Sequence, residues 1–458
     1  MGININIFEK GSMGKLLVKF AIPSIFALLV LELYNMVDTV YAGKFLGPNA
    51  IASLTVTFPI QRLIIAVGLL VAVGGSTYAA RSFGEKNLQE VKKIIITSFC
   101  LTFLVSAAVS CIIAIFRIPI LYALGASKAT FPLAQSYISI ILMGGIFQSL
   151  SVVICYIMVS LGKTRTTLYA NLIGVILNII INQLLLGVFN MGIQGAAIAT
   201  VISQIASFIY ACIEFKAVKK NFNIKLSASE VSESVSKEIL KEIVTIGFST
   251  FVIEIADAVV AVVLNNILSV IGGDSAIVIS GLITKISMFM FVTIIGISSA
   301  VQPIIAYNYG AKNYSRIKEV LFAAIKTVIS TSLILWAVLM IFAPQIAGFL
   351  LKDVNLLNDT VSAFRICISL LPFVGVYYIG IYYFQAVGEA KKSFLFSIFR
   401  ETLVFIPLVI LFSQLFGVKG VWITYPVTDA IVSLTSMIFL YRDFRVEFRA
   451  MDSLNNAI

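Results

Sequence analysis

Histidine is absent from this chain of 458 residues, and charged residues make up only 12% of it. Without imidazole, the chain has no histidine to act as a general base or to bind zinc or haem. A soluble domain has about 25% charged residues, whereas 60% of this chain is hydrophobic. The composition is therefore typical of a polytopic helical membrane protein. A β-barrel is disfavoured, because its strands alternate apolar and polar residues and these apolar runs are continuous.

Motifs of soluble catalysis are missing as well. The five cysteines stand singly in apolar runs and form no CxxC pair, which favours small helix residues over a disulfide framework. The chain has no paired metal-ligand pattern and no Walker loop. We therefore expect no enzyme activity and no resident cofactor.

Charged and Gly/Pro clusters divide the chain into about twelve apolar segments that are long enough to cross a bilayer. The predicted spans are 15–42, 48–79, 92–116, 131–160, 167–188, 193–215, 239–270, 276–305, 320–343, 361–387, 394–415 and 419–441. We expect the first segment to be a span and not a cleaved signal, because its apolar stretch is long and contains Pro23, Glu32 and Asp38.

The 33 lysine and arginine residues are distributed unevenly between the two sides. With the amino terminus inside, 23 lie in inner segments, five lie in outer loops and five lie within or beside spans. Basic residues concentrate in cytoplasmic loops, so we expect a plasma (inner) membrane protein with both termini in the cytoplasm. The net charge of +11 then follows from topology, and we expect membrane lipids as surroundings and no nucleic-acid partner.

A shift of 226 residues aligns the second half of the chain with the first. The matching positions include Lys15, Gly47, Ala80, Gly84, Lys86, Asn87 and Gly162 with Lys241, Gly273, Ala306, Gly310, Lys312, Asn313 and Gly388. One residue is lost later, where 192–195 matches 417–420. Six spans per repeat place both halves in the same orientation, related by an axis along the membrane normal, which is typical of transporters.

The repeat predicts an all-α fold of two six-helix lobes. We place the amino-terminal lobe at 1–215, a cytoplasmic connector at 216–238 and the carboxy-terminal lobe at 239–458. The connector includes the polar stretch Ser229–Ser236, which we interpret as a solvated tether.

Ionisable and amide residues inside the spans are costly in lipid and are functional candidates. In the first span, Glu32, Asn35 and Asp38 lie within one arc of the helix. In the fifth span, Asn171, Asn178 and Asn182 form one stripe, and Thr200 lies in the following span. A carboxylate with amide and hydroxyl oxygens suits Na⁺ or an exchangeable proton. The asparagine stripe alone is equally compatible with interhelical hydrogen bonding.

Several segments resemble those of the multidrug and toxic compound extrusion (MATE) family, in its NorM/DinF-like bacterial branch. They are Phe20–Pro23 with Val37–Gly43, Gly74–Asn87, Gln302–Asn313 and Ala386–Gly388. The resemblance implies an antiporter with a central cavity between two lobes, which exports lipophilic, cationic compounds in exchange for Na⁺ or H⁺. It also implies a cation site at Asp38, Asn178, Asn182 and Thr200 with the carbonyl of Ala196.

A second acidic pair, Glu254 and Asp257, lies on one face of the seventh span. Glu254 matches the seventh-helix glutamate of the NorM branch, but span ten lacks the acid that this branch has there. The pair is therefore a candidate for coupling, for attracting a cationic substrate, or for pairing with Lys285 in span eight.

Aromatic side chains in the spans offer either π-faces for a lipophilic cation or ordinary core packing. The candidates are Tyr34, Tyr41, Tyr78, Phe289, Tyr378 and Tyr382, of which Tyr34, Tyr378 and Tyr382 are predicted to contact substrate. Arg62, Arg400, Glu401 and Asp429 lie near predicted span ends, where we expect them to snorkel to the interface.

The expected mechanism is that an ion at Asp38 bends or repacks the first span near Pro23 and lowers drug affinity. We expect a monomer. A flippase for lipid-linked saccharides is an alternative, as is a specialised metabolite exporter, but a flippase would line its cavity with basic residues and the central charges here are mainly acidic.

Overall fold

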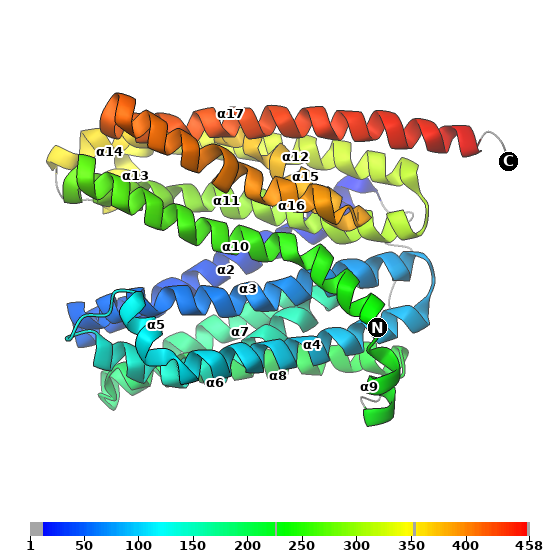
Figure 1. The fold of residues 1–458 in the computed structure, drawn as a ribbon, viewed down its shortest axis with the longest axis horizontal. Coiled ribbons are helices and arrows are strands. Elements are labelled where there is room, and N and C mark those ends of the chain that lie inside the picture. Colours follow the sequence, from blue (N-terminus) through cyan, green and yellow to red (C-terminus); the bar gives the residue numbers. More distant parts are fainter. Residues whose placement is uncertain (1–11, 225–226, 351–353, 456–458) are drawn as a thin grey trace. The chain divides into compact units, whose positions relative to one another are not determined.

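A computed structural model describes residues 12–224, 227–350 and 354–455, which are helical and contain no strand. The first half contains α2 (Met13–Leu46), α3 (Pro48–Gly84), α4 (Leu88–Ile115), α5 (Arg117–Ala123), α6 (Phe131–Ser160), α7 (Arg165–Asn182), η1 (Gln183–Val188), α8 (Gly192–Asn221) and α9 (Ala228–Ser234) (Figure 1). The second half contains α10 (Lys237–Ile271), α11 (Gly273–Gly310), α12 (Tyr314–Ile341), α13 (Ala343–Leu350), α14 (Val354–Cys367), η2 (Leu371–Phe373), α15 (Val374–Val387), α16 (Ala390–Ile398), η3 (Phe399–Phe405) and α17 (Ile406–Asn455). Here η1 and η3 are π-helical and η2 is a 3₁₀ turn.

Within the described ranges, 11 helical stretches are long and apolar enough to cross a membrane. The last of them, Ala390–Arg442, has 53 residues, whereas a single crossing needs about 20. Gly417 interrupts it with φ 61° and ψ −142°, which is not helical. This stretch therefore supplies two crossings, and the predicted all-α fold of about twelve spans is confirmed.

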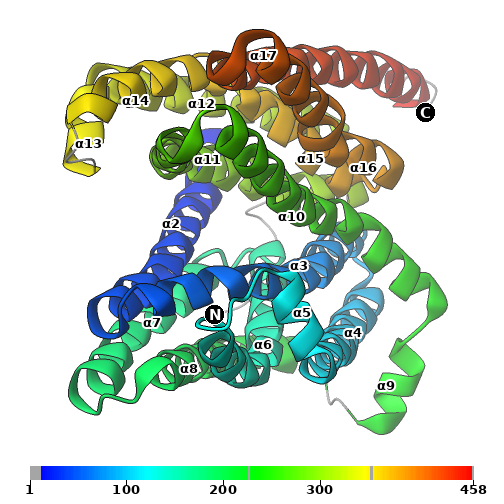
Figure 2. The same cartoon turned by 60° about the vertical axis from the view of Figure 1, so that its left-hand side comes forward.

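The described residues form two compact units. One contains Phe26–Ile255, and the other contains Ser12–Ile25 together with Ala256–Ile458. In the first unit α6 packs between α3 and α8, and in the second α11 packs against α12 and α15 (Figure 2). The helices α2 and α10 are each divided between the units. The predicted lobe boundaries follow the sequence repeat and stay a prediction.

The repeat is visible in the backbone conformation. Residues with φ between 55° and 87° occur at matching positions, namely Gly47 with Gly273, Lys86 with Lys312, Gly162 with Gly388, and Gly192 with Gly417. After each of the two lysines, an asparagine side chain caps the next helix. Asn87 Oδ1 accepts from Glu90 N at 3.1 Å, and Asn313 Oδ1 accepts from Arg316 N at 3.3 Å. The same turn is thus built twice.

The connector is more structured than the predicted tether. The helix α9 packs against α4, where Thr97 Oγ1 donates to the carbonyl of Ser234 at 3.0 Å. Glu230 forms an ion pair with Lys92. The sequence pattern missed this contact because the partners are far apart along the chain.

A close helix crossing joins α3 to the beginning of α10 within the first unit. A Cβ atom on Gly247 would lie 1.7 Å from the carbonyl oxygen of Leu70, and one on Gly74 would lie 1.9 Å from that of Ile243. Small residues allow such backbone approach in membrane helices.

Substituting Gly247→Ala should therefore destabilise the protein by about 3 kcal/mol or more, because one backbone must move away from another. The thermal unfolding midpoint of the purified protein measures this. Gly281→Ala is the matched control, since a Cβ there meets nothing within 4 Å and alanine favours a helix by about 1 kcal/mol. Equal midpoints for the two variants would contradict the close crossing.

Candidate functional site

The carboxyl group of Asp38 on α2 is buried, and it accepts hydrogen bonds from three other helices, α6, α7 and α8. From α7, Asn178 Nδ2 and Asn182 Nδ2 donate to Asp38 Oδ1 at 3.1 and 2.9 Å. From α8, Thr200 Oγ1 donates to Asp38 Oδ2 at 2.6 Å. The four-residue spacing of the asparagines brings both amides to one face of α7. The structure thus brings together the four side chains predicted for the cation site.

The same side chains also contact one another and the backbone. Asn182 Nδ2 donates to Asn178 Oδ1 at 3.1 Å, and Asn178 Nδ2 donates to Thr200 Oγ1 at 3.3 Å. The carbonyl of Ala196 lies 3.1 Å from Thr200 Oγ1. Because the hydroxyl has one proton, its shorter contact with Asp38 is the stronger bond. The Ala196 carbonyl therefore contacts the same hydroxyl that donates to Asp38, and it is the weaker of the two acceptors.

Two residues that the sequence reasoning missed complete this surrounding. The Tyr137 hydroxyl on α6 donates to Asp38 Oδ2 over a long 3.4 Å, and Gln61 Nε2 on α3 donates to the Tyr137 hydroxyl at 3.2 Å. Both were polar groups within predicted spans, which was the available signal, but spacing along a single helix does not reveal which helices meet.

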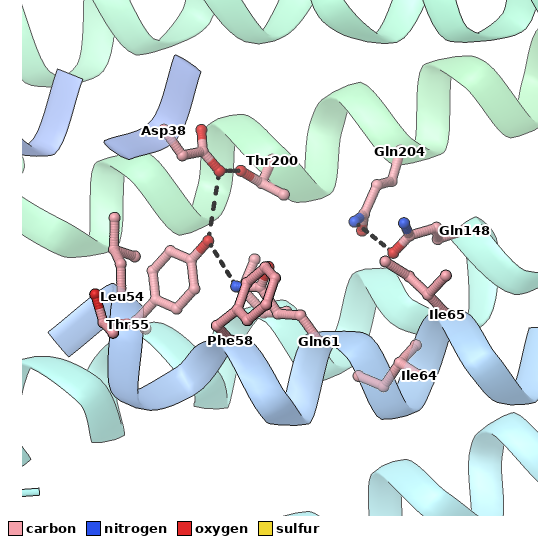
Figure 3. Close-up of a pocket in the computed structure, with 12 residues that line it drawn as sticks. Asp38, Leu54, Thr55, Phe58, Gln61, Ile64, Ile65, Gln148, Thr200 and Gln204 are labelled. Carbon is pink, nitrogen blue, oxygen red and sulfur yellow. Dashed lines mark hydrogen bonds between the residues drawn. The ribbon is translucent and has the colours of Figure 1, made fainter. Parts of the chain in front are cut away.

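A cavity of about 150 Å³ opens beside Asp38 within the first unit. Its lining comes from Asp38, Leu54, Thr55, Phe58, Gln61, Ile64, Ile65, Tyr137, Ile141, Gln148, Thr200 and Gln204. Figure 3 shows Asp38 facing Thr200 in one part of the cavity and Gln204 facing Gln148 in another, where Gln204 Nε2 donates to Gln148 Oε1 at 2.9 Å. Drug-sized ligands occupy roughly 300–1,000 Å³, so this cavity suits an ion with a few waters.

The chemistry of the site fits a singly charged cation. Among the described residues that line the cavity, Asp38 is the one charged side chain, and the other polar groups are neutral. Asn182 Oδ1 is buried and has no hydrogen-bond partner among the described residues. Rotating that amide would direct its oxygen toward the carboxylate, an arrangement that requires a cation or a proton between them. The described residues contain no group of three or more acidic or cysteine ligands, as a divalent site would favour.

Other predicted residues of the first span and of α7 lie outside this hydrogen-bonded set. Glu32 is half-buried. Asn171 Nδ2 donates to the carbonyl of Ala27 on α2 at 3.0 Å, so this asparagine makes the interhelical hydrogen bond that was the alternative to a role in the cation site. The side chains of Tyr34 and Asn35 lie outside the described part of the chain. Pro23 is inside α2 and near the residue where that helix passes from one unit to the other.

The second acidic pair is divided. Glu254 Oε2 forms an ion pair with Arg62 Nη1 at 3.0 Å within the first unit, and Arg62 also lies over the Phe58 ring. Arg62 therefore forms an ion pair with Glu254, whereas its side chain was expected from the sequence to extend to the membrane interface. Asp257 is exposed and belongs to the second unit, and Lys285 is exposed on α11. The recorded partner of Glu254 is thus Arg62 and not Lys285.

The remaining candidates lie in the second unit. Tyr378 on α15 is buried and packs edge-to-face against Tyr377, whereas Tyr382 is half-buried. The expected snorkelling of Arg400, Glu401 and Asp429 is wrong, because all three are buried and Arg400 forms an ion pair with each of the two acids. Judging depth from the nearest predicted span end misplaced them.

Comparisons with known proteins match almost the whole chain. A sequence-family model named MatE matches residues 23–184 and 246–411. The multidrug export protein MepA of Staphylococcus saprophyticus subsp. saprophyticus is 28% identical over 440 residues, which cover 95% of each chain. MepA of Staphylococcus aureus is 25% identical with the same coverage. A crystal structure of MATE in the bent conformation has a TM-score of 0.90 and 24% identity over 98% of this chain and 99% of that chain, a likeness of fold.

Removing one donor should weaken the hydrogen-bonded set around Asp38. Thr200→Val keeps the side-chain shape but leaves a buried carboxylate short of its closest donor, which should cost about 2 kcal/mol in thermal unfolding. Ser203→Ala is the matched control, because that buried hydroxyl bonds only to the carbonyl of Ala199 on its own helix at 2.7 Å. In an Asp38→Asn background the cost of Thr200→Val should shrink. An unchanged cost there would rule out the direct interaction.

Proposed function

The chain belongs to the MatE family, and from that premise we propose that it is a secondary active multidrug exporter. It exchanges lipophilic, cationic compounds for Na⁺ or H⁺ across the plasma membrane. The names of its relatives as multidrug export proteins support the cargo class. The buried carboxylate of Asp38 among neutral oxygen-bearing side chains is the observation that carries the proposal.

Asp38 is the coupling site in this proposal. An ionised carboxylate buried in a membrane helix is stable only while it is compensated, and the amide and hydroxyl donors from α7 and α8 supply that compensation. A proton or Na⁺ neutralises the carboxylate and releases those donors. The amide oxygen of Asn182 and the carbonyl of Ala196 are then available as ligands. Ion binding thus changes the hydrogen bonds that connect α2 to α7 and α8.

This change in α2 provides the link to transport. Pro23 lacks an amide proton, so the first turns of α2 have one backbone hydrogen bond fewer and bend more easily there. Asn171 holds the carbonyl of Ala27 just beyond the proline. The Asp38 contacts and the Asn171 contact therefore fix α2 after Pro23, and Pro23 is the hinge. An ion that favours one conformation weakens a drug that favours the other.

The charge around the cavity favours a cation over an anion as its occupant. The described residues of its lining include Asp38 and no lysine or arginine. A flippase for a pyrophosphate-linked saccharide would need basic groups to compensate its headgroup.

Efflux from proteoliposomes tests the proposal. A fluorescent cationic dye should leave the lumen when a Na⁺ gradient or a pH gradient is imposed, and the gradient that drives it identifies the ion. Asp38→Asn should lose gradient-driven export at least tenfold, because a neutral amide does not exchange a proton or hold the cation's charge.

Ser203→Ala is the transport control and should export at the wild-type rate. This substitution removes a hydroxyl of α8, the helix of Thr200, that bonds to the carbonyl of Ala199 and not to Asp38. If Asp38→Asn exports the dye at the wild-type rate under both gradients, Asp38 is not the coupling site. Failure of the wild type under both gradients would contradict the exporter itself.

The proposed orientation has both termini in the cytoplasm, in line with the excess of basic residues in the predicted inner segments. In a cysteine-free background, Asn190→Cys, in the exposed loop before α8, should react with an impermeant maleimide on intact cells. Ser229→Cys, exposed on α9, should react only after permeabilisation. The reverse pattern would invert the topology.

A further inference from the structure

A buried cluster of charged residues lies in the second unit, away from the Asp38 site in the sequence. Arg400 and Glu401 belong to η3, the π-helical segment between α16 and α17, and Asp429 belongs to α17. All three are buried, with Asp429 only 1% exposed. Helices α15, α16 and α17 pack together around this region (Figure 2). π-Helical segments are rare and occur frequently at functional sites.

One guanidinium compensates two carboxylates in this cluster. Arg400 Nη1 pairs with Glu401 Oε1, and Arg400 Nη2 donates to Asp429 Oδ1 at 3.1 Å. The guanidinium also lies over the Phe291 ring, 5.3 Å from its centre. With all three groups ionised, the cluster has a net charge of −1. An uncompensated charge in a membrane interior is costly.

The excess negative charge of the cluster lies where one carboxylate oxygen of Asp429 has no hydrogen-bond partner among the described residues. This oxygen, Asp429 Oδ2, is buried. The hydroxyls of Ser433 and Ser436 are also buried and without hydrogen-bond partners in the described part of the chain. They follow Asp429 by four and seven residues, so all three lie on one face of α17.

We propose that Asp429 is a proton-exchange site of the second unit, with Ser433 and Ser436 as the hydroxyl relay that leads to it. A proton delivered as hydronium forms an O–H bond on Asp429 Oδ2, while one O–H bond of the hydronium breaks and leaves water. The charge of the cluster then changes from −1 to zero. Arg400 then pairs with Glu401 alone. The hydroxyls both donate and accept, so with intervening water they pass a proton along α17.

The geometry favours a proton over a metal cation at Asp429. The Arg400 guanidinium is within 3.1 Å of the same carboxylate, and its positive charge repels a metal ion at that position. A proton adds charge without needing several ligands. The other titratable groups around the cluster are Tyr377 and Tyr378 from α15, Tyr425 from α17, Cys367 from α14 and Asp257 from α10. None of these described groups is a cation, so Arg400 is the one positive charge that they and the cluster share.

The repeat gives this position a counterpart in the first unit. With the shift of 225 residues that applies after Gly192 and Gly417, Asp429 corresponds to Gln204, which lines the cavity beside Asp38. The two halves thus have a buried polar group at equivalent positions, neutral in one and ionisable in the other. The proton site does not rest on the identity of the exported compound, and it is tested without transport.

Infrared difference spectra of the purified protein between high and low pH provide the test, because a protonated buried carboxyl has a C=O band distinct from that of a carboxylate. We expect such a band in the wild type and its loss in Asp429→Asn. Asp359→Asn, which removes an exposed carboxyl of the same unit, is the control and should keep the band. Asp38→Asn should also keep it, which separates this site from the proposed coupling site.

A wild-type spectrum in folded Asp429→Asn would overturn the proposal and leave the cluster as a structural ion pair. Because that variant changes a buried pair, Ser433→Ala offers a milder probe. It should shift the same band in frequency, since the hydrogen bonding of the protonated carboxyl changes. A band that is identical in the wild type and Ser433→Ala would exclude the relay.

Discussion

A carboxylate buried in a membrane protein needs partners from the protein itself, because lipid offers no water to compensate it. Asp38 obtains these partners from helices α6, α7 and α8, so the packing of the first unit is tied to the charge of a single side chain. All of the donors are neutral, and neutralising Asp38 removes the reason for their arrangement. The proposed coupling rests on this dependence, because a proton or a monovalent ion at Asp38 would alter helix packing. In the second unit Asp429 is compensated by Arg400, a fixed charge that stays whichever ion is present.

The two units therefore use one inherited scaffold in different ways. Left-handed residues recur at matching positions in both halves, from Gly47 and Gly273 to Gly192 and Gly417, so the turns that set helix lengths are shared. The buried polar groups are not shared. The first half has an amide at Gln204 where the second has the carboxyl of Asp429. A duplicated backbone with diverged interior charges thus places a neutral amide in one unit where the other has a carboxyl group paired with Arg400.

Much of this arrangement could be predicted from the sequence, and the failures have a common physical reason. Spans follow from the length of apolar runs, and the residues around Asp38 follow from helical spacing together with the family resemblance. Tyr137 and Gln61 were missed because periodicity gives the face of a helix but not its neighbour. Arg62 pairs with Glu254, which is 192 residues away in the chain. Arg400 was placed at an interface because a π-helical segment and its partner on α17 leave no signal in local composition.

The central claim is that an ion at Asp38 and a lipophilic cation oppose each other. The most direct measurement is the dissociation constant of a fluorescent cationic dye for the purified protein, as Na⁺ concentration and pH are varied separately. The account predicts that one of these cations weakens dye binding in the wild type and that Asp38→Asn abolishes this dependence. Dye affinity with the same ion dependence in the wild type and in Asp38→Asn would contradict it.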